Sequence, residues 1–400
     1  MAGTQDRLTP EKVTERALAD FKASDQVQIG AEVEWLVFDP DDPARNISAD
    51  QTAAIANGPL PAGGTITVEP GGQLELVTVP APGPGELVEA IDTDTAVLVE
   101  RFAAQGLSLV SLGLDPIRPA QRTLDQPRYA AMESYFSNRW PAGLVMMTRT
   151  ASLQLNIDFG PDPAQTWRTA HRMAPLLSAT FANSPSTDGV TFAKVSERQR
   201  VWAAIDPSRT APVCEHLDDW CIYVLDAPAM MRTAPNSGAV TKAPPDSFAS
   251  WLASSDPPTH ADLELHLTTL FPPVRPKGFL ELRMLDALPR TGQLAAIGTV
   301  WTLLTNADVA HSVIERAEDP DDAWRVTLSE GLSSTTLRQR AQHMLTVVAQ
   351  AMAPEDPELA EACTHWRDGL DDHQTTTRFH PGTSASRISP CQDRRSVAGE

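Results

Sequence analysis

The sequence of 400 residues is acidic, with 32 Lys and Arg against 52 Asp and Glu and a formal net charge of −20. A hydrophobic content of 42% is typical of a globular chain, and the length allows two or three domains or a single large one. Phosphate backbones and anionic lipids would repel such a chain unless it carried a basic stripe, and the sequence has no run of Lys and Arg. We therefore expect neither nucleic acid nor membranes among its partners.

Targeting signals and common cofactor motifs are also missing from the sequence. The first residues are polar, and no segment approaches the roughly 20 apolar residues of a membrane helix, so we expect a cytoplasmic protein. The 4 cysteines are irregularly spaced, and we interpret them as ordinary thiols. The motifs of P-loop, dinucleotide-binding, zinc-protease and serine-hydrolase sites do not occur. Any chemistry must therefore depend on other residues.

The first part of the chain predicts both helices and strands. Apolar residues recur at helical spacing in two segments, whereas β-branched and aliphatic runs bounded by Pro and Gly indicate strands. The sequence Glu69-Pro70-Gly71-Gly72 has the composition of a turn. The predicted elements, in chain order, are a helix beginning at Pro10, a strand over 27–38, a hairpin of strands over 65–68 and 73–79, a helix over 84–106 and a strand over 107–114.

The rest of the chain predicts two further strands among helices. Polar and apolar residues alternate over 146–159, which indicates a strand with one polar face. Residues 372–400 are poor in aliphatic side chains and predict a flexible tail behind a single domain over 1–371. Within that domain the strands should lie in about 27–289, and helices should fill about 293–371. The other predicted elements are helices over about 163–182, 217–226 and 261–270 and a strand over 279–285.

Three of the predicted strands carry a pair of polar or charged residues on one face, with at least one acid in each pair. Side chains two apart on a strand point the same way, and this applies to the pairs Glu32 with Glu34, Gln73 with Glu75, and Glu281 with Arg283. Taken alone, each pair could be a solvated polar face. Neighbouring residues are strongly apolar, however, and buried like charges would need a cation. Carboxylate oxygens that converge from several strands suit Mg²⁺ bound together with nucleotide phosphates.

Several motifs, in this order, resemble those of glutamate-cysteine ligases of the plant and bacterial type. They are Gly30-Ala31-Glu32-Val33-Glu34-Trp35, the stretch from Glu69 to Leu76, the stretch from Met147 to Phe159, the stretch from Trp202 to Thr210 that ends in Asp206-Pro207-Ser208-Arg209-Thr210, and Glu281-Leu282-Arg283. In sequence, these motifs are most similar to those of the ligase branch that serves ergothioneine synthesis. The resemblance implies an α+β, glutamine-synthetase-like fold, in which a curved, mainly antiparallel sheet forms a funnel covered by helices.

The resemblance also implies roles for individual residues. Metal-binding acids would be Glu32, Glu34, Glu69, Glu75 and Glu281, with Gln154 at a polar metal or phosphate position. Arg283 would contact nucleotide phosphate, and catalysis would depend on Glu34, Glu75 and Arg283. Arg149 and Arg209 are candidates for binding carboxylate or phosphate, although each could equally be an ordinary surface residue. Trp220 and Tyr223 could form a wall of the amino-acid pocket or belong to a helix core.

The implied reaction joins the γ-carboxylate of L-glutamate to the amine of L-cysteine. ATP and Mg²⁺ would take part, γ-glutamyl phosphate would be the intermediate, and γ-glutamylcysteine, ADP and phosphate would be the products. A ligase of the same fold with another amine remains an alternative. A phosphagen-type kinase or a nucleotide-binding protein without turnover are further ones. Product formation that needs both amino acids separates the first hypothesis from the others.

Overall fold

The computed structural model describes residues 7–137, 141–184, 195–213, 215–234, 240–244, 246–315 and 320–371. Its centre is a 7-stranded sheet in which every strand pairing is antiparallel. The strand order is β2-β3-β1-β5-β9-β8, and β4 pairs with the end of β1. The strands are β1 (Ile29–Phe38), β2 (Thr65–Val68), β3 (Leu74–Val77), β4 (Ser108–Val110), β5 (Ser152–Ile157), β8 (Val274–Pro276) and β9 (Leu280–Asp286); β6 (Met231–Thr233) and β7 (Val240–Lys242) form a separate ribbon.

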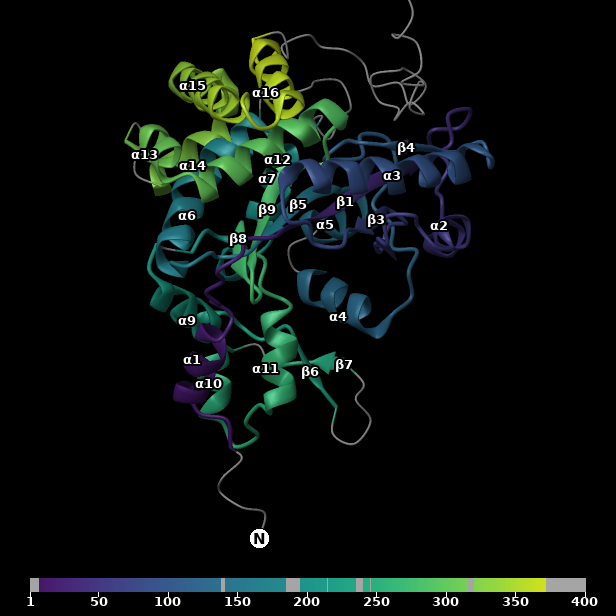
Figure 1. Cartoon of the computed structure of the whole chain (residues 1–400). Coiled ribbons are helices and arrows are strands. Elements are labelled where there is room, and N and C mark those ends of the chain that lie inside the picture. The colour runs from purple at the N-terminus through teal and green to yellow at the C-terminus, as the bar shows by residue number, and fades with distance from the viewer. Residues whose placement is uncertain are drawn as a thin grey trace, which may run out of the picture.

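Helices cover one face of this sheet in two layers (Figure 1). The inner layer consists of α3 (Pro84–Ala103), α6 (Pro163–Thr180) and α12 (Arg290–Thr305), which contact β1, β9 and β5 respectively. Alternate residues of β1, among them Val33 and Trp35, are buried in the core beneath these helices. The outer helices are α13 (Ala307–Ile314), α14 (Pro320–Ser329), α15 (Thr335–Met352) and α16 (Pro357–Gly369), with a short 3-10 turn at Gly331–Ser333.

The other face of the sheet is bordered by short helices. Next to the sheet are α4 (Pro127–Phe136), α5 (Ala142–Arg149) and α7 (Glu197–Ile205). Their apolar residues form a smaller second core that is rich in methionine, including Met132, Met146 and Met147. The remaining helices are α1 (Pro10–Leu18), α2 (Ala49–Ala56), α8 (Pro207–Thr210), α9 (Leu217–Asp226), α10 (Phe248–Leu252) and α11 (His260–Leu267).

The turn between β2 and β3 is built for close packing. Gly72 has a φ of 92°, a conformation that glycine adopts without strain. A side chain at Gly71 would collide with the backbone of Thr148 on α5, and one at Gly72 would collide with the carbonyl of Ile47. The two glycines therefore let the hairpin reach the helix, which places Glu69 beside the sheet face that carries the acids.

The expected α+β class, with an antiparallel sheet covered by helices, is confirmed. The predicted strand over 146–159 is wrong in its first part, because α5 extends to Arg149 and β5 begins at Ser152. The hydroxyls of Thr148 and Thr150 donate to the carbonyls of Leu144 and Met146, four residues earlier, as on a helix. Polar residues recur at every second position from Thr148 onward, although α5 is helical up to Arg149, and this alternation resembles that of a strand.

Other sequence-based boundaries need smaller corrections. The strand expected over 107–114 is limited to β4, and α2 lies between the strands expected over 27–38 and 65–68. The predicted tail over 372–400 lies outside the described residues. None of the helices in the described ranges combines the length and apolarity that crossing a membrane requires.

Candidate active site

A cavity of about 270 Å³ opens on the sheet face opposite α3, α6 and α12. Strands β1, β3, β5, β8 and β9 form its floor, and α4, α5 and α7 contribute its walls. Its lining is mostly charged or polar, and an apolar group of methionine and aromatic side chains is added at one side. The charged residues in the lining are Glu32, Glu34, Glu69, Glu75, Arg128, Arg198, Arg275, Lys277, Glu281 and Arg283.

Four carboxylates lie at the β1–β3 side of the cavity. Glu34 is paired directly with Glu75 across the two strands, and both are only 8% exposed. Glu32 precedes Glu34 by two residues and therefore shares its face, while Glu69 approaches from the turn. Strand pairing thus concentrates negative charge in one corner, which we call the carboxylate corner.

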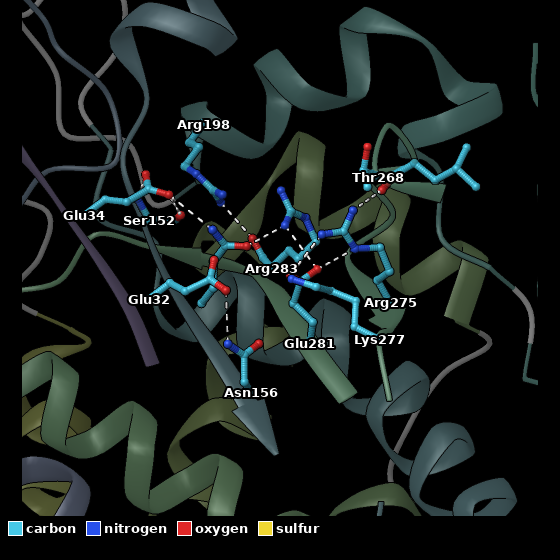
Figure 2. A network of polar contacts seen from close by, with 12 residues as sticks. Glu32, Glu34, Ser152, Asn156, Arg198, Thr268, Arg275, Lys277, Glu281 and Arg283 are labelled. Atoms are coloured by element: carbon cyan, nitrogen blue, oxygen red, sulfur yellow. Dashed lines mark hydrogen bonds and ion pairs between the residues drawn. The ribbon is translucent and has the colours of Figure 1, made fainter. Parts of the chain in front are cut away.

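Hydrogen bonds from β5 hold two of these carboxylates in place (Figure 2). Glu34 accepts from the backbone N–H of Ser152 at 2.8 Å, from the Ser152 hydroxyl at 2.9 Å and from Nε2 of Gln154 at 3.2 Å. Glu32 accepts from Nδ2 of Asn156 at 3.2 Å. The polar residues of β5 therefore act as supports for the acids of β1.

Cations gather at the other side of the cavity around Glu281, which is 0% exposed. Arg275 donates to both oxygens of Glu281, from Nε at 2.6 Å and from Nη2 at 3.0 Å. Lys277 donates at 2.9 Å and Arg283 at 3.1 Å. Figure 2 shows these side chains converging on the single carboxylate. Three cations around one anion leave an excess of positive charge. We call Arg275, Lys277 and Arg283 the cation group.

Arg283 connects the two sides of the cavity. Its Nη1 donates to Oε1 of Gln154 at 2.5 Å as well as to Glu281. Its guanidinium also lies 5.8 Å from the ring of Trp202 and 5.7 Å from that of Phe271. These contacts restrain a long side chain that would otherwise have many rotamers, so its charge is held at one position.

The two sides differ in how readily their carboxylates ionise. Burial, and then the charges of Glu34 and Glu32, raise the pKa of Glu75 to about 8. Burial and the neighbouring Glu75 and Glu34 also raise the pKa of Glu69 well above its ordinary value. Burial would likewise raise the pKa of Glu281, but Arg275, Arg283 and Lys277 outweigh it and hold that pKa well below its usual range. The carboxylate corner therefore has too few neighbouring cations to balance its negative charge, whereas more cations surround Glu281 than its single charge requires.

A hard divalent cation fits the carboxylate corner by the chemistry of its donors. All four acids offer oxygen ligands, and burial together with the neighbouring carboxylates raises the pKa of Glu34, Glu69 and Glu75. Across the described ranges no three acidic, His or Cys side chains already surround one ion position. Mg²⁺ takes one or two carboxylates and completes its shell with water and phosphate oxygens.

Comparisons with known proteins agree with this geometry. The model of glutamate-cysteine ligase family 2 (GCS2) matches residues 28–376. The chain belongs to this family. It is 40% identical over 353 residues to the glutamate–cysteine ligase EgtA of Mycolicibacterium smegmatis, which covers 84% of this chain and 82% of the relative. The EgtA protein of Mycobacterium tuberculosis is 38% identical over 347 residues, covering 82% and 80%.

A solved structure shows a similar fold at low sequence identity. The glutamate–cysteine ligase of Francisella tularensis, in a complex with AMP, superimposes with a TM-score of 0.54 at 13% identity, covering 88% of this chain and 84% of that one. The expectation that this chain is a ligase of the glutamate-cysteine type is therefore confirmed by its family.

The structure of this family member brings most of the expected site residues into one cavity. Those that line it are Glu32, Glu34, Glu69, Glu75, Gln154, Glu281 and Arg283. The oxygens of Glu281 accept hydrogen bonds from Arg275, Lys277 and Arg283, and its expected role as a metal ligand stays a prediction. A metal ion could reach Glu281 only after some of these cations turned elsewhere.

The other expected substrate contacts lie outside the cavity. Arg149, at the end of α5, donates from Nε and Nη2 to the carbonyl of Asp115. Arg209 is 0% exposed and binds Asp206, a backbone carbonyl at Thr269 and the Tyr135 hydroxyl. Both guanidiniums hold loops to the fold, neither lines the cavity, and their contact with substrate stays a prediction.

Trp220 and Tyr223 also belong to the fold, away from the cavity. Their rings stack on α9 with centroids 5.7 Å apart, and Trp220 is only 1% exposed within the main core. One helical turn separates them, so the apolar stripe that buries α9 includes both. The helix-core alternative is the one that the structure supports.

Several residues that line the cavity were not predicted from the sequence. Arg275 and Lys277 lie on the β8 side of a hairpin whose turn contains Gly278, with a φ of 82°. Arg275 pairs across that hairpin with Glu281, and a search for alternating charges before Phe279 could have found this arrangement. Arg128 and Tyr129 on α4 carry no such local signal, because only the packing of α4 brings them to the sheet.

Proposed function

We propose that this ligase joins the γ-carboxylate of L-glutamate to the amine of L-cysteine, with conversion of ATP to ADP and phosphate. The observation that carries the proposal is the pairing of a carboxylate corner with a cation group in one cavity. A reaction between a carboxylate and ATP brings two anions together, so the site has to compensate their charge and align them. Opposite charges on facing walls supply both requirements.

The carboxylate corner would hold Mg²⁺, through Glu32, Glu34, Glu69 and Glu75. When bound, Mg²⁺ would neutralise charge on the nucleotide phosphates. The hydrogen bonds from Ser152, Gln154 and Asn156 would keep the acids oriented without contributing further charge. This role explains why four acids are kept together at the cost of their mutual repulsion.

The cation group would contact the phosphoryl oxygens. Arg283 and Lys277 each present N–H donors at the cavity surface, and both are anchored by Glu281. Phosphate oxygens would compete with Glu281 for these donors, since charge-assisted hydrogen bonds to phosphate are strong. Glu281 would then keep only its bidentate partner Arg275 and regain acceptor capacity on each oxygen, which is the condition for it to take part in metal binding.

The chemical steps follow from this placement. Attack of the glutamate γ-carboxylate on the terminal phosphorus of ATP breaks the bond to ADP and gives γ-glutamyl phosphate. The uncharged amine of cysteine then attacks the γ-carbonyl carbon, and phosphate leaves with the electron pair of the broken C–O bond. The likeness to EgtA proteins supports ergothioneine synthesis as the use of the dipeptide.

An assay of ADP release tests the proposal. Purified protein, ATP and Mg²⁺ are combined with glutamate, cysteine or both, and the products are identified by mass. We expect rapid ADP release only with both amino acids, together with equimolar γ-glutamylcysteine. Release without an amine, with a stable phosphorylated product, would indicate a kinase. A different amine that outperforms cysteine by a large factor would indicate a ligase with another acceptor.

A further inference from the structure

Arg128 differs in its partners from the cations that bind Glu281. Arg275, Lys277 and Arg283 all bind Glu281, whereas Arg128 donates only to Thr268, from Nη1 to the hydroxyl at 3.0 Å and from Nη2 to the carbonyl at 3.2 Å. Within the described part of the chain Arg128 forms no ion pair. A guanidinium has five N–H donors, so three remain for a ligand. The charge of Arg128 is therefore available for an anion in the cavity.

The helix that carries Arg128 also supplies a soft apolar surface. Met132 lies one turn further along α4 and lines the same cavity, so both side chains are on one helix face. Met146 and Met147 of α5 continue this surface, and all three methionines are at most 6% exposed. Thioether side chains are polarisable and adapt to a small, weakly polar group such as a thiol.

Acidic side chains lie within electrostatic reach of the same helix. Glu69 and Glu75 line the same cavity as Arg128 and Tyr129. An amino acid lying on α4 could therefore direct its carboxylate to Arg128 and its amino group toward the carboxylate corner. That orientation points the amine at the place where the glutamyl phosphate would form.

We propose that Arg128 binds the carboxylate of the acceptor amino acid, with Met132, Met146 and Met147 against its side chain. This inference rests on the proposed function and assigns the acceptor to a subsite of its own. Glutamate fits the place less well, because its second carboxylate would have to lie against the apolar methionine surface. Cysteine has one carboxylate and a small thiol, as the wall requires.

Acceptors with and without a carboxylate test the proposal directly. Cysteamine is cysteine without its carboxylate, so the ratio of kcat/KM for the two acceptors measures recognition of that group. In the unchanged protein we expect cysteine to be preferred by roughly 10- to 100-fold, the range for hydrogen bonds to a charged group. In Arg128→Met this preference should fall to less than about threefold, mainly through weaker use of cysteine. Arg128→Lys, which keeps the charge, should recover part of it.

Controls separate this role from a structural one. Arg122 binds Glu133 and Asp125 at the start of α4 outside the cavity, so Arg122→Met should leave the preference intact. Glutamate is compared with 4-aminobutyrate, which lacks the α-carboxylate, to detect binding of the donor by Arg128. Loss of that discrimination in Arg128→Met, or equal losses with cysteine and cysteamine, would overturn the proposal.

The unchanged protein provides an outcome that does not depend on the folding of a variant. If it uses cysteamine as well as cysteine, no residue recognises the acceptor carboxylate, and the proposal is wrong. If it forms no γ-glutamylcysteine at all, the proposed function fails first. These two results are distinct in the same assay.

Discussion

Glu75 lies where burial and neighbouring charge both act against its ionised form. It is paired with Glu34 across β1 and β3, and its pKa is raised from 4.5 to about 8. Replacement by Gln preserves size and an acceptor for the Thr67 hydroxyl but removes the charge. We expect Glu75→Gln to stabilise the metal-free protein at alkaline pH while it abolishes most activity. Stability and activity should thus change in opposite directions.

The size of the effect follows from the pKa. In the folded protein Glu75 retains a proton to higher pH than in the unfolded chain, so the stability that it contributes is present below pH 4.5 and disappears as pH rises through 8. One pKa unit corresponds to about 1.4 kcal/mol, which makes the total loss on the order of 3 to 5 kcal/mol. For a domain of this size we expect the melting temperature of Glu75→Gln to exceed that of the unchanged protein by roughly 4 to 6 °C at pH 8.5.

Thermal unfolding at pH 5 and pH 8.5, with EDTA or with Mg²⁺, measures this prediction. The gain in melting temperature should be much smaller at pH 5, where the unchanged protein keeps the proton. Mg²⁺ should raise the melting temperature of the unchanged protein more than that of the variant, because binding to the folded state stabilises it. A variant that is less stable than the unchanged protein at pH 8.5 would refute the argument that repulsion and burial dominate at this position.

Two further predictions concern the two sides of the cavity. Glu34→Gln should lower turnover at least about 100-fold, or near 2.7 kcal/mol of barrier, because one charge of the carboxylate corner is lost while Ser152 keeps an acceptor. Initial rates at several Mg²⁺ concentrations check this prediction, and unchanged rates would remove Glu34 from the site. Arg275→Met should destabilise the fold by about 3 to 5 kcal/mol in urea unfolding, because the buried Glu281 loses its bidentate partner. As a control, Arg325→Met removes an exposed ion pair and should cost less than about 1 kcal/mol. Equal losses in the two variants would contradict this argument.

Local sequence patterns determined the polar face of the sheet. Side chains alternate along a strand, so Glu32 and Glu34 had to share a side, as did Glu281 and Arg283, whatever the tertiary structure. Apolar neighbours such as Val33 and Trp35 identified the opposite side as core, and the structure buries both. The motif order identified the family for the same reason, since it depends on short segments that are recognisable without their partners.

Tertiary structure alone decided which cations meet these acids. The sequence predicted a role for Arg149 and gave no signal for Arg128, yet the first donates to a backbone carbonyl and the second lines the cavity. The difference arises from the packing of α4 and α5, which depends on contacts between residues far apart in the chain. The pairing of β8 with β9 likewise placed Arg275 on Glu281, so the carboxylate that was expected to bind metal also anchors the cation group. Strand period is a property of neighbouring residues, whereas these encounters are properties of the whole fold.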